Sequence, residues 1–374
     1  MLYKLSDIFD LQMGKTPSRD NNMYWKDGNL PWVSIADLSK SQIYIENSKE
    51  MITNLAAKDT SMKCIPQDTV IMSFKLSLGK TAITKTPLYT NEAIMAFVDK
   101  KIIQIEPKYI YFLFSNIKWG QYTNNAVKGK TLNKKFFSDF QIYIPEYIQQ
   151  TKIASILIRI NKILEYKHSL IKAYDALIKS RFVEMFEVFN INPNNYNTIK
   201  FKDLIERNNI NEEDKVWLLN LDMIKPNTGE IVEKVYINRQ NIPASSISFK
   251  KGTVLYSKLR PYLNKVVIAD ENGYGTSELI PLNSYKNGLT AEYLAYYLRQ
   301  DSFVDYIKDK VTGAKMPRVA MDILRNIDII QPNYIYQEQF SSFVNHVNKL
   351  KSDVQKSIDE TQLLMDSLMQ EYFG

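Results

Sequence analysis

Apolar residues recur at sevens in two long segments of the chain, residues 148–189 and 334–374. This pattern predicts two long helices, each with a broad apolar face. We expect that face to contain Leu157, Ile160, Leu164, Ile171 and Ile178 in the first helix, and Val347, Val354, Ile358, Met365 and Leu368 in the second. Neither helix can bury such a face alone, so we expect them to pair antiparallel. The alternative is that each helix packs on its own globular domain.

Shorter apolar runs bounded by turn-forming residues precede each long segment and predict strands. They are TVIMSF from Thr69, IIQIE from Ile102 and QIYIP from Gln141, then TVLYSKL from Thr253, KVVIA from Lys265 and IDIIQP from Ile327. Helical candidates, KYIYFLFSNI and AEYLAYYLRQ, lie between them. The predicted fold class is therefore mixed α/β.

The two halves of the chain align with each other at an offset of 184 to 187 residues. WVSIAD at Trp32 matches WLLNLD at Trp217, and TVIMS matches TVLYS. The segment from Pro145 matches the segment from Pro332. Chance explains any one match, but not their common order and offset.

The repeat divides the chain into five parts. We expect a first globular domain at residues 1–147, a long helix at 148–189 and a linker at 190–197. A second domain at 198–333 and the C-terminal long helix at 334–374 complete the second copy. An antiparallel helix pair would relate the two domains by a pseudo-two-fold axis.

Composition narrows the chemistry. A net charge of +7 favours polyanionic partners. A single cysteine excludes an internal disulfide and a thiolate zinc cluster within one chain. Two histidines far apart in the sequence disfavour metal ligation and a histidine-based triad. The first residues do not resemble a signal peptide, and no run of eighteen apolar residues occurs, so we expect a cytoplasmic protein without membrane spans.

Catalytic motifs are missing from the sequence. There is no Pro-Asp dipeptide of the common metal-dependent nucleases, no dinucleotide-binding GxGxxG and no Asn-Pro-Pro-aromatic motif of amino-methyltransferases. Gly14-Lys15-Thr16 has only the end of a phosphate loop, and Pro17 follows where a helix should begin. We therefore nominate no catalytic residue and no metal ligand.

Basic and aromatic residues instead gather in loops of both globular segments, where lysines and arginines suit contacts to DNA phosphates and bases. In the first copy the candidate DNA-binding residues are Lys15, Thr16, Ser18, Arg19, Lys75, Lys80, Lys128 and Lys130. In the second copy they are Lys258, Arg260, Tyr262, Lys265, Lys315 and Arg318. The alternatives are solvated surface charge and, for residues 14–32, an ordinary long turn.

The ordered set of these features resembles the specificity subunits of type I restriction-modification systems. It comprises GKTPSRDNNMYWKDGNLPWVSIADL, SKLRPYL, the VKGK and VTGAK turns, QIYIPEYIQQTKIASIL and the duplicated domain-plus-helix plan. The second copy departs from the pattern, because RNNINEEDKVW precedes Trp217 where the first copy has the GKTPSR loop.

The resemblance implies two target recognition domains that each bind one half of a split, asymmetric double-stranded DNA sequence, held apart by the helix pair. It implies no catalytic site in this chain. Two methyltransferase subunits would dock on the helices and supply S-adenosylmethionine chemistry. Two restriction subunits, using ATP and magnesium, would join through them. The alternatives are the recognition subunit of a two-component type II enzyme, a stand-alone nuclease or methyltransferase, and a structural coiled-coil adaptor.

Overall fold

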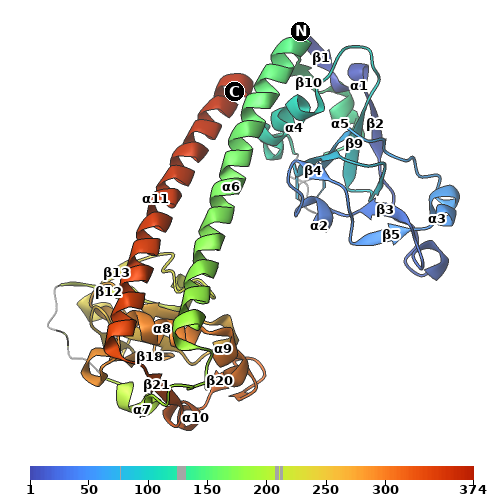
Figure 1. Ribbon diagram of the computed structural model, residues 1–374. Helices are drawn as coiled ribbons and strands as arrows, with labels where there is room; N and C mark the ends of the chain where they lie inside the picture. Colours follow the sequence, from blue (N-terminus) through green and yellow to red (C-terminus); the bar gives the residue numbers. More distant parts are fainter. Residues whose placement is uncertain (76, 124–131, 207–209, 211–213) are drawn as a thin grey trace. The chain divides into compact units, whose positions relative to one another are not determined.

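Two 40-residue helices, α6 (Tyr147–Phe186) and α11 (Tyr334–Phe373), dominate the computed structural model (Figure 1). Their bounds agree with the predicted segments 148–189 and 334–374 to within three residues. The structure describes every residue except 76, 124–131, 207–209 and 211–213. The chain forms two units: unit 1 contains Met1–Tyr166 and Ile358–Gly374, and unit 2 contains Lys167–Ser357.

Unit 1 is built on a five-stranded sheet in the order β2-β9-β6-β7-β4, beside a three-stranded sheet β5-β3-β8 and the pair β1-β10. The strands are β1 (Leu2–Lys4), β2 (Phe9–Met13), β3 (Leu30–Val33), β4 (Tyr44–Ile45), β5 (Glu50–Ile52), β6 (Val70–Ser73), β7 (Thr81–Thr84), β8 (Tyr89–Thr90), β9 (Ile94–Asp99) and β10 (Gln141–Tyr143). The short helices are α1 (Leu5–Ile8), α2 (Ile35–Leu38), α3 (Asn54–Asp59), α4 (Pro107–Asn116) and α5 (Lys134–Asp139).

The central strand β6 is apolar from Val70 to Met72 because both of its faces are covered. Val70 and Met72 point into the core that includes α4, α5 and the first turns of α6, whereas Ile71 points into a second core. Successive side chains of a strand alternate between faces, so a strand buried on both sides carries a continuous apolar run.

Unit 2 repeats this plan with its strands divided differently among the sheets. Its sheets are β13-β12-β17-β14 and β16-β15-β18, and its small pairs are β11-β21 and β19-β20. The strands are β11 (Asn197–Lys200), β12 (Lys215–Leu219), β13 (Val235–Asn238), β14 (Ile247–Phe249), β15 (Val254–Ser257), β16 (Val266–Ile268), β17 (Gly273–Gly275), β18 (Leu279–Leu282), β19 (Val311–Thr312), β20 (Arg318–Val319) and β21 (Asp328–Gln331). The helices are α7 (Phe201–Leu204), α8 (Ala291–Arg299), α9 (Asp301–Lys308) and α10 (Met321–Arg325).

Strand pairing shows the same order in both units. In unit 1, β6 lies antiparallel between β7 and β9, and β3 runs parallel to β8. In unit 2, β15 lies antiparallel between β16 and β18, and β12 runs parallel to β17. The aligned tryptophans, Trp32 and Trp217, both lie on the parallel pair and are 2% and 1% exposed. Each anchors the core of its own unit.

A buried glutamine fastens the start of α6 to the domain before it. Gln150, 1% exposed, accepts a hydrogen bond from the backbone N–H of Glu106 at 2.9 Å. Its Nε2 donates to the backbone oxygens of Gln104 at 3.1 Å and Pro145 at 2.9 Å. One side chain thus satisfies three backbone groups, of which the oxygen of Pro145 is bonded at a buried position and the other two at part-buried positions.

Gln337 does the same at the start of α11. It is 0% exposed, accepts from the N–H of Thr290 at 3.0 Å and donates to the oxygens of Gly288 at 3.2 Å and Pro332 at 2.8 Å. Each of these residues lies 184 or 187 positions after its counterpart around Gln150. The offset found in the sequence therefore corresponds to the same hydrogen bonds in both units.

Each unit contains a stretch of both long helices. In unit 1 the last turns of α11, including Met365 and Leu368, pack on the core that holds Leu157. In unit 2 the first turns of α11, with Phe340, Val344 and Val347, share a core with Ile178. Within each unit, the stretch of α6 and the stretch of α11 run in opposite chain directions. Each helix thus contributes to both units, which differs from the five consecutive segments expected from the sequence.

Burial along the helices follows the predicted stripes. Leu157, Ile160, Leu164, Ile178, Val347 and Ile358 are buried. Ile171, Val354, Met365 and Leu368 are half-buried. Both histidines, His168 and His346, are exposed on these helices.

The strand prediction for IIQIE was wrong. Residues 102–106 form no strand, and Lys101 before them adopts a left-handed φ of 59°. The backbone groups at Gln104 and Glu106 are instead taken by the side chain of Gln150. The other five predicted runs contain β6, β10, β15, β16 and β21.

Candidate nucleic-acid interface

The segment after β2 is not a phosphate-binding loop. The N–H of Gly14 donates to the oxygen of Ile94 at 3.3 Å, and that of Lys15 to the oxygen of Thr90 at 2.9 Å. A Cβ on Gly14 would stand 2.2 Å from the backbone oxygens of Thr90 and Asn91, so glycine is required for this close approach. The amides that would bind a phosphate are therefore used in fixing the loop to its neighbours.

The carboxylate of Glu92 interacts with the residues that follow Lys15. Thr16 donates its hydroxyl hydrogen bond to the Glu92 carboxylate. Burial alone raises the pKa of Glu92, but the Thr16 hydrogen bond and the charges of Lys75 and Arg19 outweigh burial and hold this pKa below its ordinary value. Thr16 and Arg19 of one loop and Lys75 after β6 thus act on one carboxylate, Thr16 through a hydrogen bond and the two cations through their charge.

Arg19 is held on two sides. Its Nη1 and Nη2 both bond to the carboxylate of Glu50, with Nη2 3.0 Å from Oε2. Its guanidinium carbon lies 3.9 Å from the ring centroid of Trp25 and 5.1 Å from that of Trp32. The oxygen of Ser18 accepts a hydrogen bond from the indole of Trp25 at 3.0 Å. The loop is thereby folded around its own aromatic residues.

The other first-copy candidates are lysines near the end of β6. Lys75 is half-buried, with Nζ 5.3 Å from the ring centroid of Phe74. Lys80 is exposed, and its backbone N–H donates to the hydroxyl of Ser73 at 3.0 Å. Lys128 and Lys130 lie outside the described residues.

In unit 2 the SKLRPYL segment forms a tight left-handed turn. Arg260 has φ 47°, and its N–H donates to the oxygen of Pro317 at 2.8 Å. Its guanidinium lies 3.5 Å from the oxygen of Lys315. Tyr262 is 44% exposed beside it. The turn and the segment around Lys315 therefore form one surface with two exposed cations.

Glu278 is the second carboxylate around which candidates gather. Arg318 binds it through Nε, 3.0 and 3.1 Å from the two carboxylate oxygens, and through Nη2 at 2.7 Å from Oε1. This hydrogen bonding is the main cause of a pKa below the ordinary value for Glu278, and the charge of Lys258 adds to it.

Lys265 points inward. Its Nζ donates to the backbone oxygen of Leu221, and burial lowers its pKa while the charge of Asp222 opposes that effect. Its ammonium group is therefore used within the fold.

Sequence reasoning missed Glu92 and Glu278, although a signal was present. TNEAI and TSELI match at an offset of 186, inside the range of the repeat. A single acidic residue among basic ones forms no pattern of its own, so only the repeat marks it. The two glutamates are equivalent acceptors with different partners in the two units.

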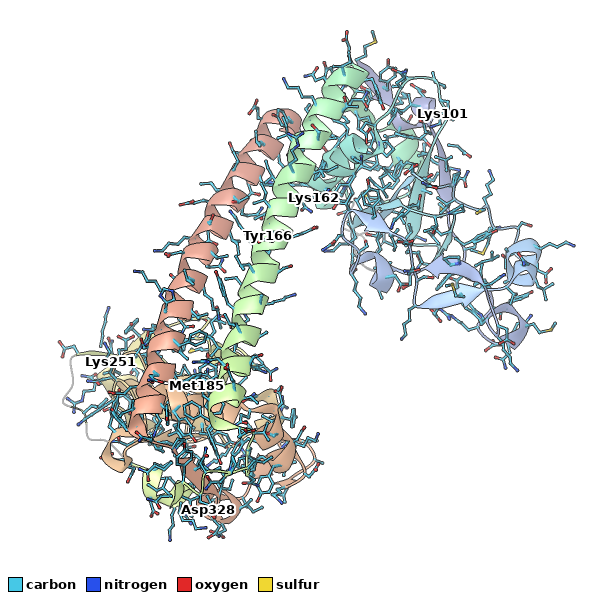
Figure 2. The ribbon with its side chains drawn as sticks, viewed as in Figure 1. Lys101, Lys162, Tyr166, Met185, Lys251 and Asp328 are labelled. Carbon is cyan, nitrogen blue, oxygen red and sulfur yellow. The ribbon has the colours of Figure 1, made fainter. Side chains whose placement is uncertain are left out.

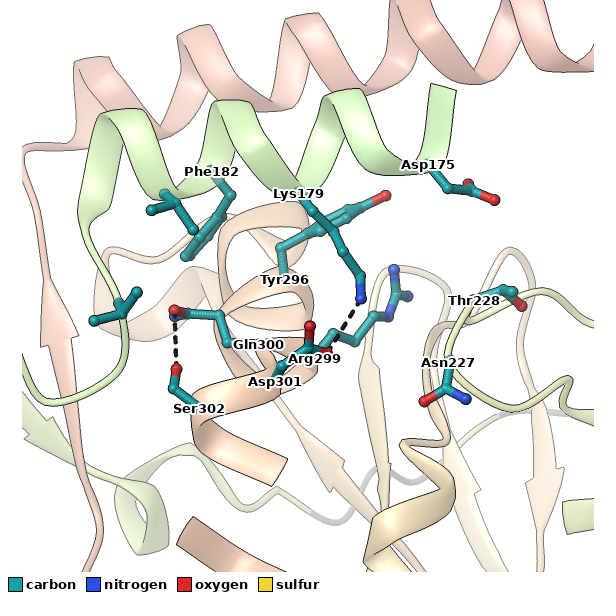
Figure 3. A pocket seen from close by; sticks show the side chains of 12 residues that line it. Asp175, Lys179, Phe182, Asn227, Thr228, Tyr296, Arg299, Gln300, Asp301 and Ser302 are labelled. Atoms are coloured by element: carbon teal, nitrogen blue, oxygen red, sulfur yellow. Dashed lines mark hydrogen bonds and ion pairs between the residues drawn. The ribbon is translucent and has the colours of Figure 1, made fainter. Parts of the chain in front are cut away.

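A cavity of about 200 Å³ lies in unit 2 beside α6 (Figure 3). Both of its carboxylates are in ion pairs: Asp301 lies 3.2 Å from Lys179, and Asp175 bonds to Lys351. No histidine or cysteine is among the residues that line it. The cavity has no nucleophile paired with a general base.

Arg299 forms one wall of this cavity and is 8% exposed. Its Nε donates to the oxygen of Val266 at 3.0 Å, and its guanidinium carbon lies 4.9 Å from the Tyr296 ring centroid. A Cβ on Gly229 would stand 2.0 Å from Nη2. Burial lowers the pKa of Arg299. These contacts connect α8 to β16 and the loop above, which is a scaffolding role.

Over the residues that the structure describes, no three His, Cys, Asp or Glu side chains come together as a metal site would require. No described helix has the length and apolar character needed to cross a membrane.

Comparison with known proteins finds one matching family model and several similar proteins. The model of the type I restriction modification DNA specificity domain matches residues 1–173. The MjaIX specificity subunit of Methanocaldococcus jannaschii is 23% identical, over 98% of this chain and 90% of that protein. The HindI specificity subunit of Haemophilus influenzae is 28% identical, over 41% of this chain and 34% of that protein.

Solved structures support the fold. A chain from a study of complex assembly in the type I R-M system aligns with a TM-score of 0.62 and 13% identity, covering 100% of this chain and 97% of that one. The type I S subunit from M. genitalium aligns with a TM-score of 0.57 and 11% identity, covering 100% and 96%.

Residues 1–173 therefore match the type I restriction modification DNA specificity domain. The whole chain is related to type I specificity subunits, which are non-catalytic, so the resemblance seen in the sequence is confirmed. The mixed α/β fold class is confirmed as well. The general function is recognition of a DNA sequence.

Proposed function

We propose that each unit binds one half of a bipartite DNA target, unit 1 through the surface around Glu92 and unit 2 through the surface around Glu278. The observation that supports this proposal is that both units have an equivalent glutamate, Glu92 and Glu278, with different side chains around it. Thr16 bonds to Glu92, on which the charges of Arg19 and Lys75 act, whereas Arg318 bonds to Glu278, on which the charge of Lys258 acts. Different side chains on one frame fit two different half-sites, and hence an asymmetric target.

Within this proposal, residues 1–147 and 198–333 act as the two target recognition domains, and residues 148–189 and 334–374 set the spacing between half-sites. The linker at residues 190–197 joins the two copies. The protein would work in the cytoplasm, where its DNA lies.

We further propose that methyltransferase subunits dock on the outer faces of the long helices. Large apolar side chains remain exposed on these helices: Ile163 is 47% exposed on α6, and Leu363 is 71% exposed on α11. Tyr166 of α6, labelled in Figure 2, is 70% exposed. Exposed apolar rows of this kind mark interaction surfaces. S-adenosylmethionine would be bound by those methyltransferase subunits, and ATP and magnesium by two restriction subunits that join through them.

The test is methylation profiling of cells that express this chain with its methyltransferase. A split, asymmetric motif supports the proposal, whereas a continuous palindrome or no motif contradicts it. The same scaffold would serve a two-component type II enzyme, so cleavage assays of the assembled complex distinguish the two. ATP-dependent cleavage far from the target indicates type I, and cleavage on both sides of it indicates type II.

The purified chain with DNA, magnesium and S-adenosylmethionine separates a recognition subunit from a stand-alone nuclease or methyltransferase. We expect DNA binding at most, and no turnover. Affinity should fall steeply with salt, because each neutralised phosphate contributes about −0.9 to the slope of log K against log salt. A structural adaptor would bind DNA without this dependence or not at all.

A further inference from the structure

Arg318 presents an unoccupied hydrogen-bonding edge. A guanidinium has one edge formed by Nε and Nη2 and another formed by Nη1 and Nη2. Glu278 occupies the first, with Nε at 3.0 and 3.1 Å and Nη2 at 2.7 Å. No hydrogen bond to Nη1 is formed from any part of the chain that the structure describes, and the side chain is 41% exposed.

Arg19 shows the opposite arrangement. Glu50 binds its Nη1 and Nη2 together, so the edge that Arg318 leaves open is closed in Arg19. Two indole rings cover the Arg19 guanidinium as well. The two arginines therefore differ in what they offer to a ligand, although both pair with a glutamate.

The backbone of Arg318 is fixed. It lies on β20, where it pairs with Thr312 of β19 and forms a bridge to Leu259. The next residue, Val319, donates its N–H to the oxygen of Lys258 at 3.1 Å. With its backbone in a strand and its Nε edge bound by a carboxylate, the side chain has little rotational freedom left to lose on binding.

Neighbouring charges favour DNA. Lys258, Arg260 and Lys315 lie around the Arg318–Glu278 pair, so the surface stays positive although Glu278 neutralises one charge. The exposed ends of Arg260 and Lys315 suit phosphates, which need charge rather than fixed geometry. A guanidinium edge held in one orientation suits a base, and guanine O6 and N7 are the acceptor pair that this edge matches.

We propose that Arg318 reads a guanine in the major groove of the half-site bound by unit 2, and that Glu278 is its positioning residue. This rests on the proposed binding of a half-site by unit 2. A DNA phosphate also offers two acceptors to a guanidinium edge. The experiment below distinguishes a guanine contact from a phosphate contact.

Selection from random DNA duplexes with the full chain gives the motif, and competition binding gives the affinity at each base. R318Q is expected to remove the preference for one guanine in one half-site, by roughly 5- to 150-fold, and to leave every other position unchanged. R318K keeps the charge but not the fork, so it should lose the same preference. R325Q is the matched control, because Arg325 is an exposed arginine paired with Asp322 in the same unit.

Two further arms identify the contact. Placing 7-deazaguanine at that position removes N7, and this should weaken binding by the wild-type chain but not by R318Q. E278Q should relax preference at the same guanine only, and should add nothing in the R318Q background. A purely structural role for Glu278 would instead weaken both half-sites or lower the melting temperature without a change of base preference.

Uniform loss of affinity for all sequences in R318Q, with the 7-deazaguanine effect retained, would identify a phosphate contact and overturn the proposal. An unchanged motif would overturn it too. If the wild-type chain selects no motif, the proposed function fails instead. If R318Q does not fold, R318K replaces it in the experiment, because lysine keeps a charged hydrogen-bond donor for Glu278.

Discussion

Gln337→Leu should lower the free energy of unfolding of unit 2, although leucine suits a buried position. Leucine is close in volume to glutamine but forms no hydrogen bonds, so three backbone groups lose their partners. The N–H of Thr290 and the oxygen of Pro332 are bonded at buried positions, and the oxygen of Gly288 is part-buried.

The magnitude follows from those environments. A buried backbone group without a partner costs about 1–3 kcal/mol, so the two buried groups cost about 4 kcal/mol together, and the part-buried one adds about 1. The greater apolarity of leucine returns about 1 kcal/mol. The net loss is about 4 kcal/mol, or roughly a thousandfold in the unfolding equilibrium.

Native-state hydrogen exchange read by mass spectrometry measures this unit by unit. Slowly exchanging amides of α8 and β15 should lose about three orders of magnitude of protection, while peptides of β6 and β9 in unit 1 act as an internal reference. Gln339→Leu is the control, because Gln339 is exposed on the same helix. Equal effects of the two substitutions, or a loss confined to unit 1, would refute the reasoning.

Three further outcomes are expected. Gly14→Ala should move the GKTPSR loop, because the added Cβ would meet two backbone oxygens, and should weaken binding to one half-site only; equal weakening of both, by footprinting, contradicts this. The stability advantage of wild type over Glu278→Gln should be present above the ordinary glutamate pKa of about 4.3 and vanish as pH falls through the lowered pKa of Glu278, as denaturation at stepped pH tests. Four residues added to α6 within residues 156–178, with four added to α11, lengthen the pair by about 6 Å. Methylation profiling should then show a spacer about two base pairs longer, since DNA rises 3.4 Å per base pair; an unchanged spacer would rule out a measuring role for the helices.

The sequence predicted the parts of the fold that depend on periodic burial. Apolar residues that recur every seven positions predicted α6 and α11, because a helix that packs along its whole length buries the same face at every second turn. The constant offset located equivalent residues such as Trp32 and Trp217 because both copies keep one core. A short run such as IIQIE has the composition of a strand, but its backbone partner is a glutamine more than forty residues away, which no local pattern reveals.

The candidate site was predicted only as a set of loops. Nothing local distinguishes Arg318, braced by a carboxylate 40 positions earlier, from Arg19, whose outer edge is closed by a carboxylate 31 positions later. Lys265 resembles its neighbours in sequence, yet its ammonium group lies against the oxygen of Leu221. Direction and pairing of long charged side chains are set by tertiary contacts, so they follow only from the folded chain.

The division of the chain into units bears on the order in which the protein is made. Unit 2 is one continuous stretch, Lys167–Ser357, whereas unit 1 needs Ile358–Gly374 beside its first 166 residues. Met365, Leu368 and Phe373 cover the core around Tyr109 and Leu157. As synthesis proceeds from the amino end, the later domain is the first with all of its residues available. We therefore expect unit 1 to keep an uncovered apolar face during synthesis until the last turns of α11 are made.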